Sequence, residues 1–120
     1  MWVITSTAFV SIVQHREQPG LLIVRGRFKG DVERFLAVPG HLRPIEEVTP
    51  NADYRYRCVV PRELVAAAMQ REVQRIAYPN FKDSIVAKWR KALALRVWSL
   101  FHAAQNERAG LARRLGASEH

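Results

Sequence analysis

The chain has 120 residues, 48% of them hydrophobic and 25% charged, which is typical of a single globular domain and too short for two. The formal net charge is +8 and is uneven: eight Lys/Arg against six Asp/Glu give +2 in residues 1–60, and eleven against five give +6 in residues 61–120. This surplus favours a polyanionic partner, nucleic acid or anionic lipid. The lone cysteine, Cys58, excludes an internal disulfide and a Cys-based zinc site.

Residues 2–15 are rich in β-branched side chains and lack helical spacing, which predicts one long strand, bent near residues 6–8. No basic residue precedes this apolar stretch, which argues against a signal peptide, and no segment is long enough to span a bilayer. We therefore expect a cytoplasmic protein. A turn at residues 17–20 leads into a second strand over 21–28, so the two strands form an antiparallel hairpin.

Gly30 and Asp31 begin a short predicted helix, with Asp31 as its cap, and Pro39-Gly40 ends it. Residues 45–48 can form a short edge strand. Residues 54–60 alternate clearly between turn signals at 51–53 and Pro61. Positions 54, 56, 58 and 60 therefore share one face, which makes Cys58 a core residue, and Arg55 and Arg57 share the other.

A second helix is predicted from Pro61 to about residue 77, where Tyr78-Pro79 ends it. Asn80 can cap a third, long helix that starts at Phe81 and carries apolar residues at spacings of three and four. We expect one α+β domain over residues 1–106 and a flexible basic tail over 107–120.

The order of elements fits a ferredoxin-like sandwich that is circularly permuted to ββαββα and followed by the long C-terminal helix. In this topology the strands at 21–28 and 54–60 form the central pair, and the crossover through residues 31–37 is right-handed. The opening Met1-Trp2 strand, the Tyr54-Arg55-Tyr56-Arg57 strand, the helix start at residues 80–83 and the Trp98 region resemble a family of short uncharacterised bacterial proteins. The resemblance spans most of the chain and implies a complete domain, but no activity, substrate or catalytic residue.

The predicted fold brings four guanidinium groups to the middle of the open sheet face, from Arg25, Arg27, Arg55 and Arg57. Their planar forks of donors suit phosphate, and Phe9 is the one ring expected beside them for stacking, so backbone binding is favoured over base reading. The alternative is a solvated sheet face, or arginines paired with Glu46, Glu47 or acids on the third helix.

The third helix offers a second basic surface, with Lys82, Lys88 and Lys91 off its apolar stripe. Either these lysines extend the phosphate-binding surface of the arginines, or they lie on a helix face that is simply exposed to solvent. Leu95, Trp98 and His102 widen the apolar surface beyond one contact, which suggests a second packing partner.

Enzymatic constellations are missing from the sequence, so we expect a non-enzymatic module without metal or cofactor. The four histidines have no ligand spacing, and Glu46 and Glu47 are neighbours that a strand would point to opposite faces. The leading hypothesis is a module that binds RNA or DNA through the arginines. The alternatives are a protein-interaction module, which pairs with a second copy or an acidic protein through the third helix, and a metal-dependent nuclease using Asp31.

Overall fold

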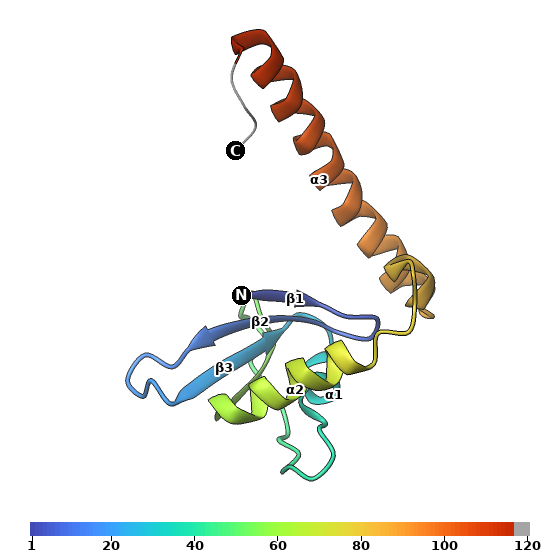
Figure 1. Cartoon of the computed structure of the whole chain (residues 1–120). Helices are drawn as coiled ribbons and strands as arrows, with labels where there is room; N and C mark the ends of the chain where they lie inside the picture. Colours follow the sequence, from blue (N-terminus) through green and yellow to red (C-terminus); the bar gives the residue numbers. More distant parts are fainter. Residues whose placement is uncertain (117–120) are drawn as a thin grey trace. The chain divides into compact units, whose positions relative to one another are not determined.

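The computed structural model describes residues 1–116. The chain divides into two compact units, Met1–Pro79 (unit 1) and Asn80–His120 (unit 2), of which unit 2 is described up to residue 116 (Figure 1). The strands of unit 1 are β1 (Trp2–Ile4), β2 (Phe9–Gln14), β3 (Leu21–Gly26), β4 (Glu47–Val48) and β5 (Tyr56–Pro61). Its helices are α1 (Asp31–Leu36) and α2 (Arg62–Gln74), and unit 2 contains the 3-10 turn η1 (Phe81–Ser84) and α3 (Lys88–Leu115). Within residues 1–116, no helix combines the length and the apolar character needed to cross a membrane.

The segment predicted as one strand over residues 2–15 is a hairpin of β1 and β2, so that prediction was wrong. Thr5 closes the reversal: its backbone N–H donates to the carbonyl of Ala8 at 2.8 Å, and its Oγ1 accepts from the N–H of Ala8 at 3.0 Å. Trp2 thereby lies opposite Ser11 and faces the same side of the sheet. In a single continuous strand, Trp2 and Ser11 would have pointed to opposite sides.

The sheet has the order β1-β2-β3-β5-β4, and every neighbouring pair is antiparallel. The predicted central pair is confirmed, because β3 lies against β5 with Val24 opposite Cys58 and Arg25 opposite Arg57. The predicted edge strand is confirmed as β4, although it is only two residues long. The architecture is α+β and consistent with a ferredoxin-like sandwich, while the circular permutation stays a prediction.

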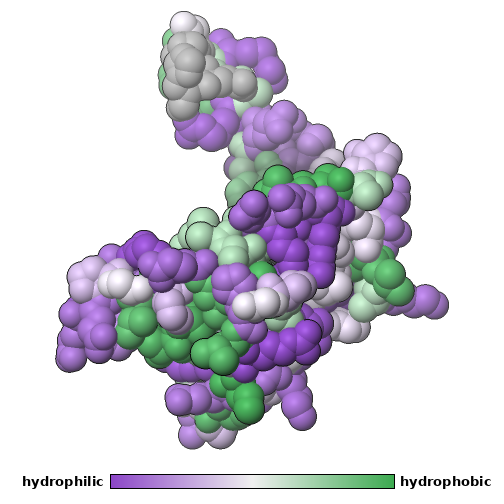
Figure 2. Space-filling view, turned by 60° about the horizontal axis from the view of Figure 1, so that its bottom comes forward, coloured by the Kyte–Doolittle hydropathy of each residue, from purple (hydrophilic) through white to green (hydrophobic). Residues whose placement is uncertain are grey.

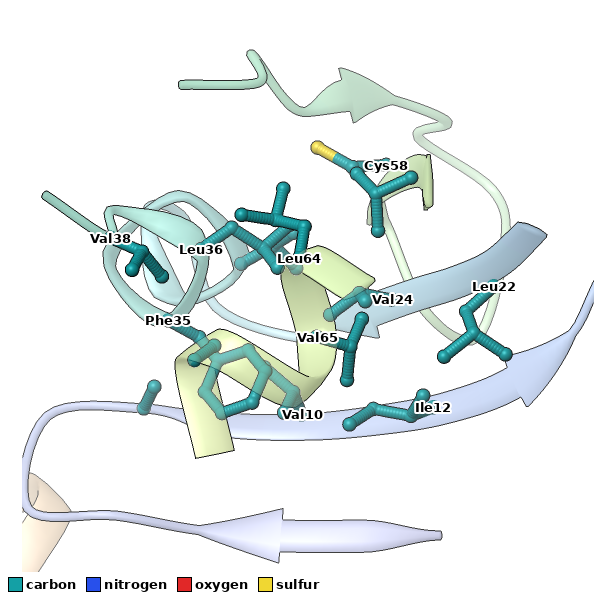
Figure 3. Packing of buried hydrophobic residues seen from close by; sticks show 14 residues of the cluster. Val10, Ile12, Leu22, Val24, Phe35, Leu36, Val38, Cys58, Leu64 and Val65 are labelled. Atoms are coloured by element: carbon teal, nitrogen blue, oxygen red, sulfur yellow. The ribbon is translucent and has the colours of Figure 1, made fainter. Parts of the chain in front are cut away.

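The core of unit 1 lies between one face of the sheet and the two helices α1 and α2 (Figure 3). Val10, Val24, Val32 and Leu36 have no exposed surface, and Phe35 is almost fully buried. The strand residues in this core are those that alternate inward, as the predicted period of two requires. The opposite face of the sheet carries no helix of this unit.

Asp31 does not cap its helix as predicted. Gly30 holds the N-cap position with a φ of 87°, a conformation that favours glycine. The Asp31 side chain is fully buried, where Oδ2 accepts from the N–H of Phe9 at 2.9 Å and Oδ1 pairs with Arg34. This carboxylate therefore connects the start of α1 to β2.

A buried arginine donates hydrogen bonds to backbone carbonyl groups at the end of α1. Arg71, on α2, donates from Nη1 to the carbonyl of Ala37 at 2.6 Å and from Nη2 to that of Phe35 at 2.7 Å, and it forms an ion pair with Glu72. The last carbonyls of a helix lack partners within the helix, so these bonds fasten α1 to α2.

The predicted third helix begins later and ends later than expected. The Asn80 side chain does act as a cap, by accepting from the N–H of Lys82, but it caps the short turn η1 and not the long helix. The chain is extended at Ile85, and α3 starts only at Lys88. The helix then continues through the predicted tail to Leu115, and residues 117–120 of that tail lie outside the described residues. The second helix ends at Gln74 instead of residue 77.

Cys58 is a buried core residue, as predicted, and its thiol is expected to be inert. Burial, and then the charges of Glu46, Glu33 and Glu47, raise the pKa of Cys58 from 9.0 to about 11. At pH 8 the thiolate fraction falls about 100-fold for these two pKa units, so a disulfide reagent should react at least that much more slowly than with free cysteine. Because the folded pKa is raised, the contribution of Cys58 to the free energy of unfolding should be fully present below pH 9 and lost as the pH rises through about 11, so the wild type should lose more stability than C58A over this interval.

Candidate functional site

The register of the sheet places one residue from each strand in a single row on the helix-free face of unit 1. Trp2 lies opposite Ser11, Ser11 opposite Arg25, Arg25 opposite Arg57, and Arg57 opposite Glu47. Residues directly opposite each other in an antiparallel pair point to the same face. We call this surface the arginine face. Two of the four predicted arginines are thus neighbours at its centre.

Tyr54 is the residue that organises the arginine face, which the sequence analysis did not foresee. It precedes β5, after a turn in which Asp53 Oδ1 accepts from the N–H of Tyr54 at 2.9 Å. The guanidinium carbons of Arg25 and Arg27 lie 4.5 and 4.1 Å from the centroid of its ring. Tyr54 is only 4% exposed, but it lies with the arginines and not in the core with Cys58, so the prediction that positions 54–60 alternate throughout was wrong at this end.

The guanidinium groups of this face bond to neutral acceptors. Arg25 donates to Ser11 Oγ at 2.8 Å, Arg57 to the carbonyl of Tyr54 at 3.2 Å, and Arg27 to the carbonyl of Asp53 at 3.0 Å. The Nε atoms of Arg25 and Arg57 are buried without a hydrogen-bond partner. A buried donor without a partner costs free energy, and the Nε of Arg71 in the interior shares this condition.

None of the four arginines Arg25, Arg27, Arg55 and Arg57 forms an ion pair with a carboxylate of residues 1–116; Arg34 pairs with Asp31, and Arg71 with Glu72. Glu47 lies opposite Arg57 in register but forms no ion pair with it, and Glu46 Oε1 instead accepts from the N–H of Gly30 at 2.7 Å. The alternative in which Glu46 or Glu47 holds the arginines is therefore not supported.

Arg55 and Phe9, the two remaining predicted site residues of unit 1, differ in exposure and in contacts. The side chain of Arg55 is exposed and forms no hydrogen bond or ion pair with the described part of the chain. Phe9 is half-buried, and its ring centroid lies 6.3 Å from that of Trp2. Thr5 and Thr7 lie in the hairpin turn and not along the face. Trp2, 70% exposed, is thus a second ring beside Phe9 that the sequence analysis missed.

The other predicted site residues belong to unit 2. The Lys82 Nζ lies 5.2 Å from the centroid of the Trp98 ring, which stacks on His102 at 4.8 Å. Lys88 is exposed and Lys91 is half-buried. Leu95 lines a shallow hollow along α3 with Ser99, Leu100 and others.

Large hydrophobic side chains are exposed along α3. Trp98 is 52% exposed, and Leu100 and Phe101 are each 72% exposed. In the space-filling view, hydrophobic residues reach the surface among hydrophilic ones (Figure 2). Large apolar side chains on α3 therefore remain available for contact with another molecule.

The structure locates the residues considered for metal binding and for a nuclease. No group of three or more His, Cys, Asp or Glu side chains is placed there to hold a metal ion. Both oxygens of Asp31, the residue considered for a nuclease, are engaged with Phe9 and Arg34 in the interior.

Comparison with known proteins adds no assignment: no family model, curated protein or solved structure matches this chain.

Proposed function

We propose that this chain is a non-enzymatic binding module that contacts the phosphate backbone of RNA or DNA through Arg25, Arg27, Arg55 and Arg57. The observation that carries the proposal is the pair of adjacent arginines, Arg25 and Arg57, which lie directly opposite each other in register and form no ion pair with a carboxylate of the described residues. Guanidinium groups bind phosphate through two parallel hydrogen bonds, so a phosphate oxygen is a fitting acceptor for them.

The charge of the whole chain supports the same partner. The net charge is +8, and α3 contributes seven Lys/Arg against one Glu, or +6. Lys82, Lys88 and Lys91 add long-range attraction for a polyanion without specifying its sequence.

The proposal predicts a steep dependence of binding on salt. If the four arginines neutralise four phosphates, log Kd should rise with log salt concentration at a slope of about 3 for a single strand. Raising the salt from about 50 to about 200 mM should then weaken binding about 50-fold, measured by fluorescence anisotropy with a labelled oligonucleotide. A slope near zero, or no binding at low salt, would refute the proposal.

A second candidate is a protein-interaction module, because α3 exposes Trp98, Leu100 and Phe101. A contiguous exposed apolar patch on a protein surface often marks such an interface. In this candidate function, the partner is a second copy of the chain or an acidic protein, and it is contacted by Leu95, Trp98 and His102. Sedimentation equilibrium on the same samples distinguishes the two: a discrete dimer that dissociates in W98A favours this candidate.

A further inference from the structure

We propose that the arginine face selects single-stranded nucleic acid by stacking an unpaired base on Trp2, with Phe9 supporting the indole. This inference rests on the proposed function and deepens it, from binding of any phosphate chain to recognition of strands with accessible bases. It reverses the expectation from sequence that the face lacks rings for base contact.

Trp2 is placed for such a contact by the β1–β2 hairpin. It is 70% exposed on the edge strand, while its neighbour Val3 turns inward and packs against the core. The strand is held in place at its start, because the N–H of Ile12 donates to the carbonyl of Met1 at 2.8 Å. An exposed indole on a strand that is tied down at this end is a rigid surface for a planar ligand.

Phe9 gives the indole a fixed neighbour. The two ring centroids are 6.3 Å apart and the planes are inclined at 57°, which is within the range of favourable aromatic pairs. Phe9 is half-buried and therefore anchors the pair to the sheet. One side of the indole is thus supported, while most of its surface stays available to a base.

The distance from the Trp2 indole to Arg25 is suited to a nucleotide, which carries a planar base and a phosphate group. Trp2 and Arg25 are separated by the single strand β2, and strands are spaced about 4.8 Å apart, so their backbones lie about 10 Å apart. Arg25 leans towards Trp2, because its Nη2 donates to Ser11, the residue directly between them. A base on Trp2 would have its phosphate within reach of Arg25.

The chemistry favours a single strand over a duplex. Bases in a duplex are covered by their neighbours, whereas single strands present faces that stack on aromatic side chains without regard to sequence. Sheet-face aromatics serve this purpose in RNA-recognition modules. Arg25 and Arg57 supply the electrostatic part, and Trp2 supplies the selection for an exposed base.

The test compares wild type, W2A and the matched control I4A, which shortens an exposed aliphatic side chain on the same strand and face. Each is titrated with a single-stranded oligonucleotide, as RNA and as DNA, with an abasic strand of equal phosphate number, and with inorganic polyphosphate. We expect W2A to weaken binding to the base-bearing strands about 5- to 150-fold. W2A should leave abasic-strand and polyphosphate affinity unchanged, and I4A should change neither by more than about 2-fold.

Fluorescence reports the contact directly. In a W89F/W98F background Trp2 is the only tryptophan, and a stacked base should quench its emission whereas polyphosphate should not. Equal affinity of wild type and W2A for every ligand, or a duplex bound as tightly as the single strand, would overturn the stacking inference while leaving the phosphate proposal intact. A self-association lost in W2A without an effect on nucleic-acid affinity would also overturn it. No binding to any of the polyanions would instead defeat the proposed function.

Discussion

Reversing the charges of Arg25 and Arg57 together should weaken binding to a single-stranded oligonucleotide at least about 100-fold. Each substitution, R25E and R57E, removes charge-assisted hydrogen bonds to phosphate, worth about 1.5–3 kcal/mol apiece, and adds a repulsive carboxylate. The slope of log Kd against log salt should fall from about 3 to about 1.4, because two phosphate contacts remain. Fluorescence anisotropy across a salt series measures both quantities.

The matched control for this experiment is R16E/R75E. Both residues are exposed on unit 1 and make no side-chain bond with the described part of the chain. Each double variant changes the net charge by −4, from +8 to +4, so general electrostatic attraction is lowered equally. Equal losses in the two double variants would mean that net charge alone drives binding, and the arginine face would lose its role.

The second large effect concerns folding and arises at Arg71. Replacing it in R71M should lower the free energy of unfolding by about 3 kcal/mol, because the carbonyls of Phe35 and Ala37 lose their donors in the interior. The midpoint of thermal unfolding should fall by about 10 °C or more, followed by circular dichroism.

Two further variants separate this role of Arg71 from a general effect of removing an arginine from this region. R71K keeps a positive charge and a hydrogen-bond donor but lacks the planar guanidinium group that reaches two carbonyls at once. Its unfolding midpoint should therefore lie between those of R71M and the wild type. R75A removes an exposed arginine one turn further along the chain and should change the midpoint by no more than about 2 °C. A midpoint for R71M equal to that of R75A would show that the two carbonyls do not depend on Arg71.

The central half of the sheet could be predicted from sequence because alternation there is regular. Leu22 and Val24 alternate with Ile23 and Arg25, and Cys58 and Val60 alternate with Arg57 and Val59, so the inward face and the Arg25–Arg57 pair follow from the period of two. Each of these two strands has one charged face and one apolar face. A shift of either strand by one residue would expose its apolar face, so the observed register is favoured.

The ends of the sheet could not be predicted, because side-chain hydrogen bonds decide them. The turn at residues 5–8 contains no Gly, Pro, Asn or Asp, and the Thr5 hydroxyl replaces their usual contribution. The sequence therefore predicts a single strand through these threonines, and the position of Trp2 opposite Ser11 does not follow from it. Near Tyr54 the Asp53 side chain shapes the turn, so that the alternation starts only at Tyr56.

For α3 the sequence predicts surplus apolar surface at Leu95, Trp98 and His102, but not which residues of the helix stay exposed. Spacings of three and four predict an apolar stripe correctly, but they do not say whether the chain itself supplies the partner for that stripe. Trp98, Leu100 and Phe101 are exposed, although the same pattern on α2 buries Leu64, Val65 and Ala68.

The adjacent positive charges of Arg25 and Arg57 connect anion binding to folding. Like charges directly opposite each other in a sheet are destabilising, so this pair lowers the stability of unit 1 relative to a neutral pair at the same positions. An anion bound at the two guanidinium groups would offset their repulsion, and because it would bind the folded state and not the unfolded chain, the midpoint of thermal unfolding would rise with its concentration.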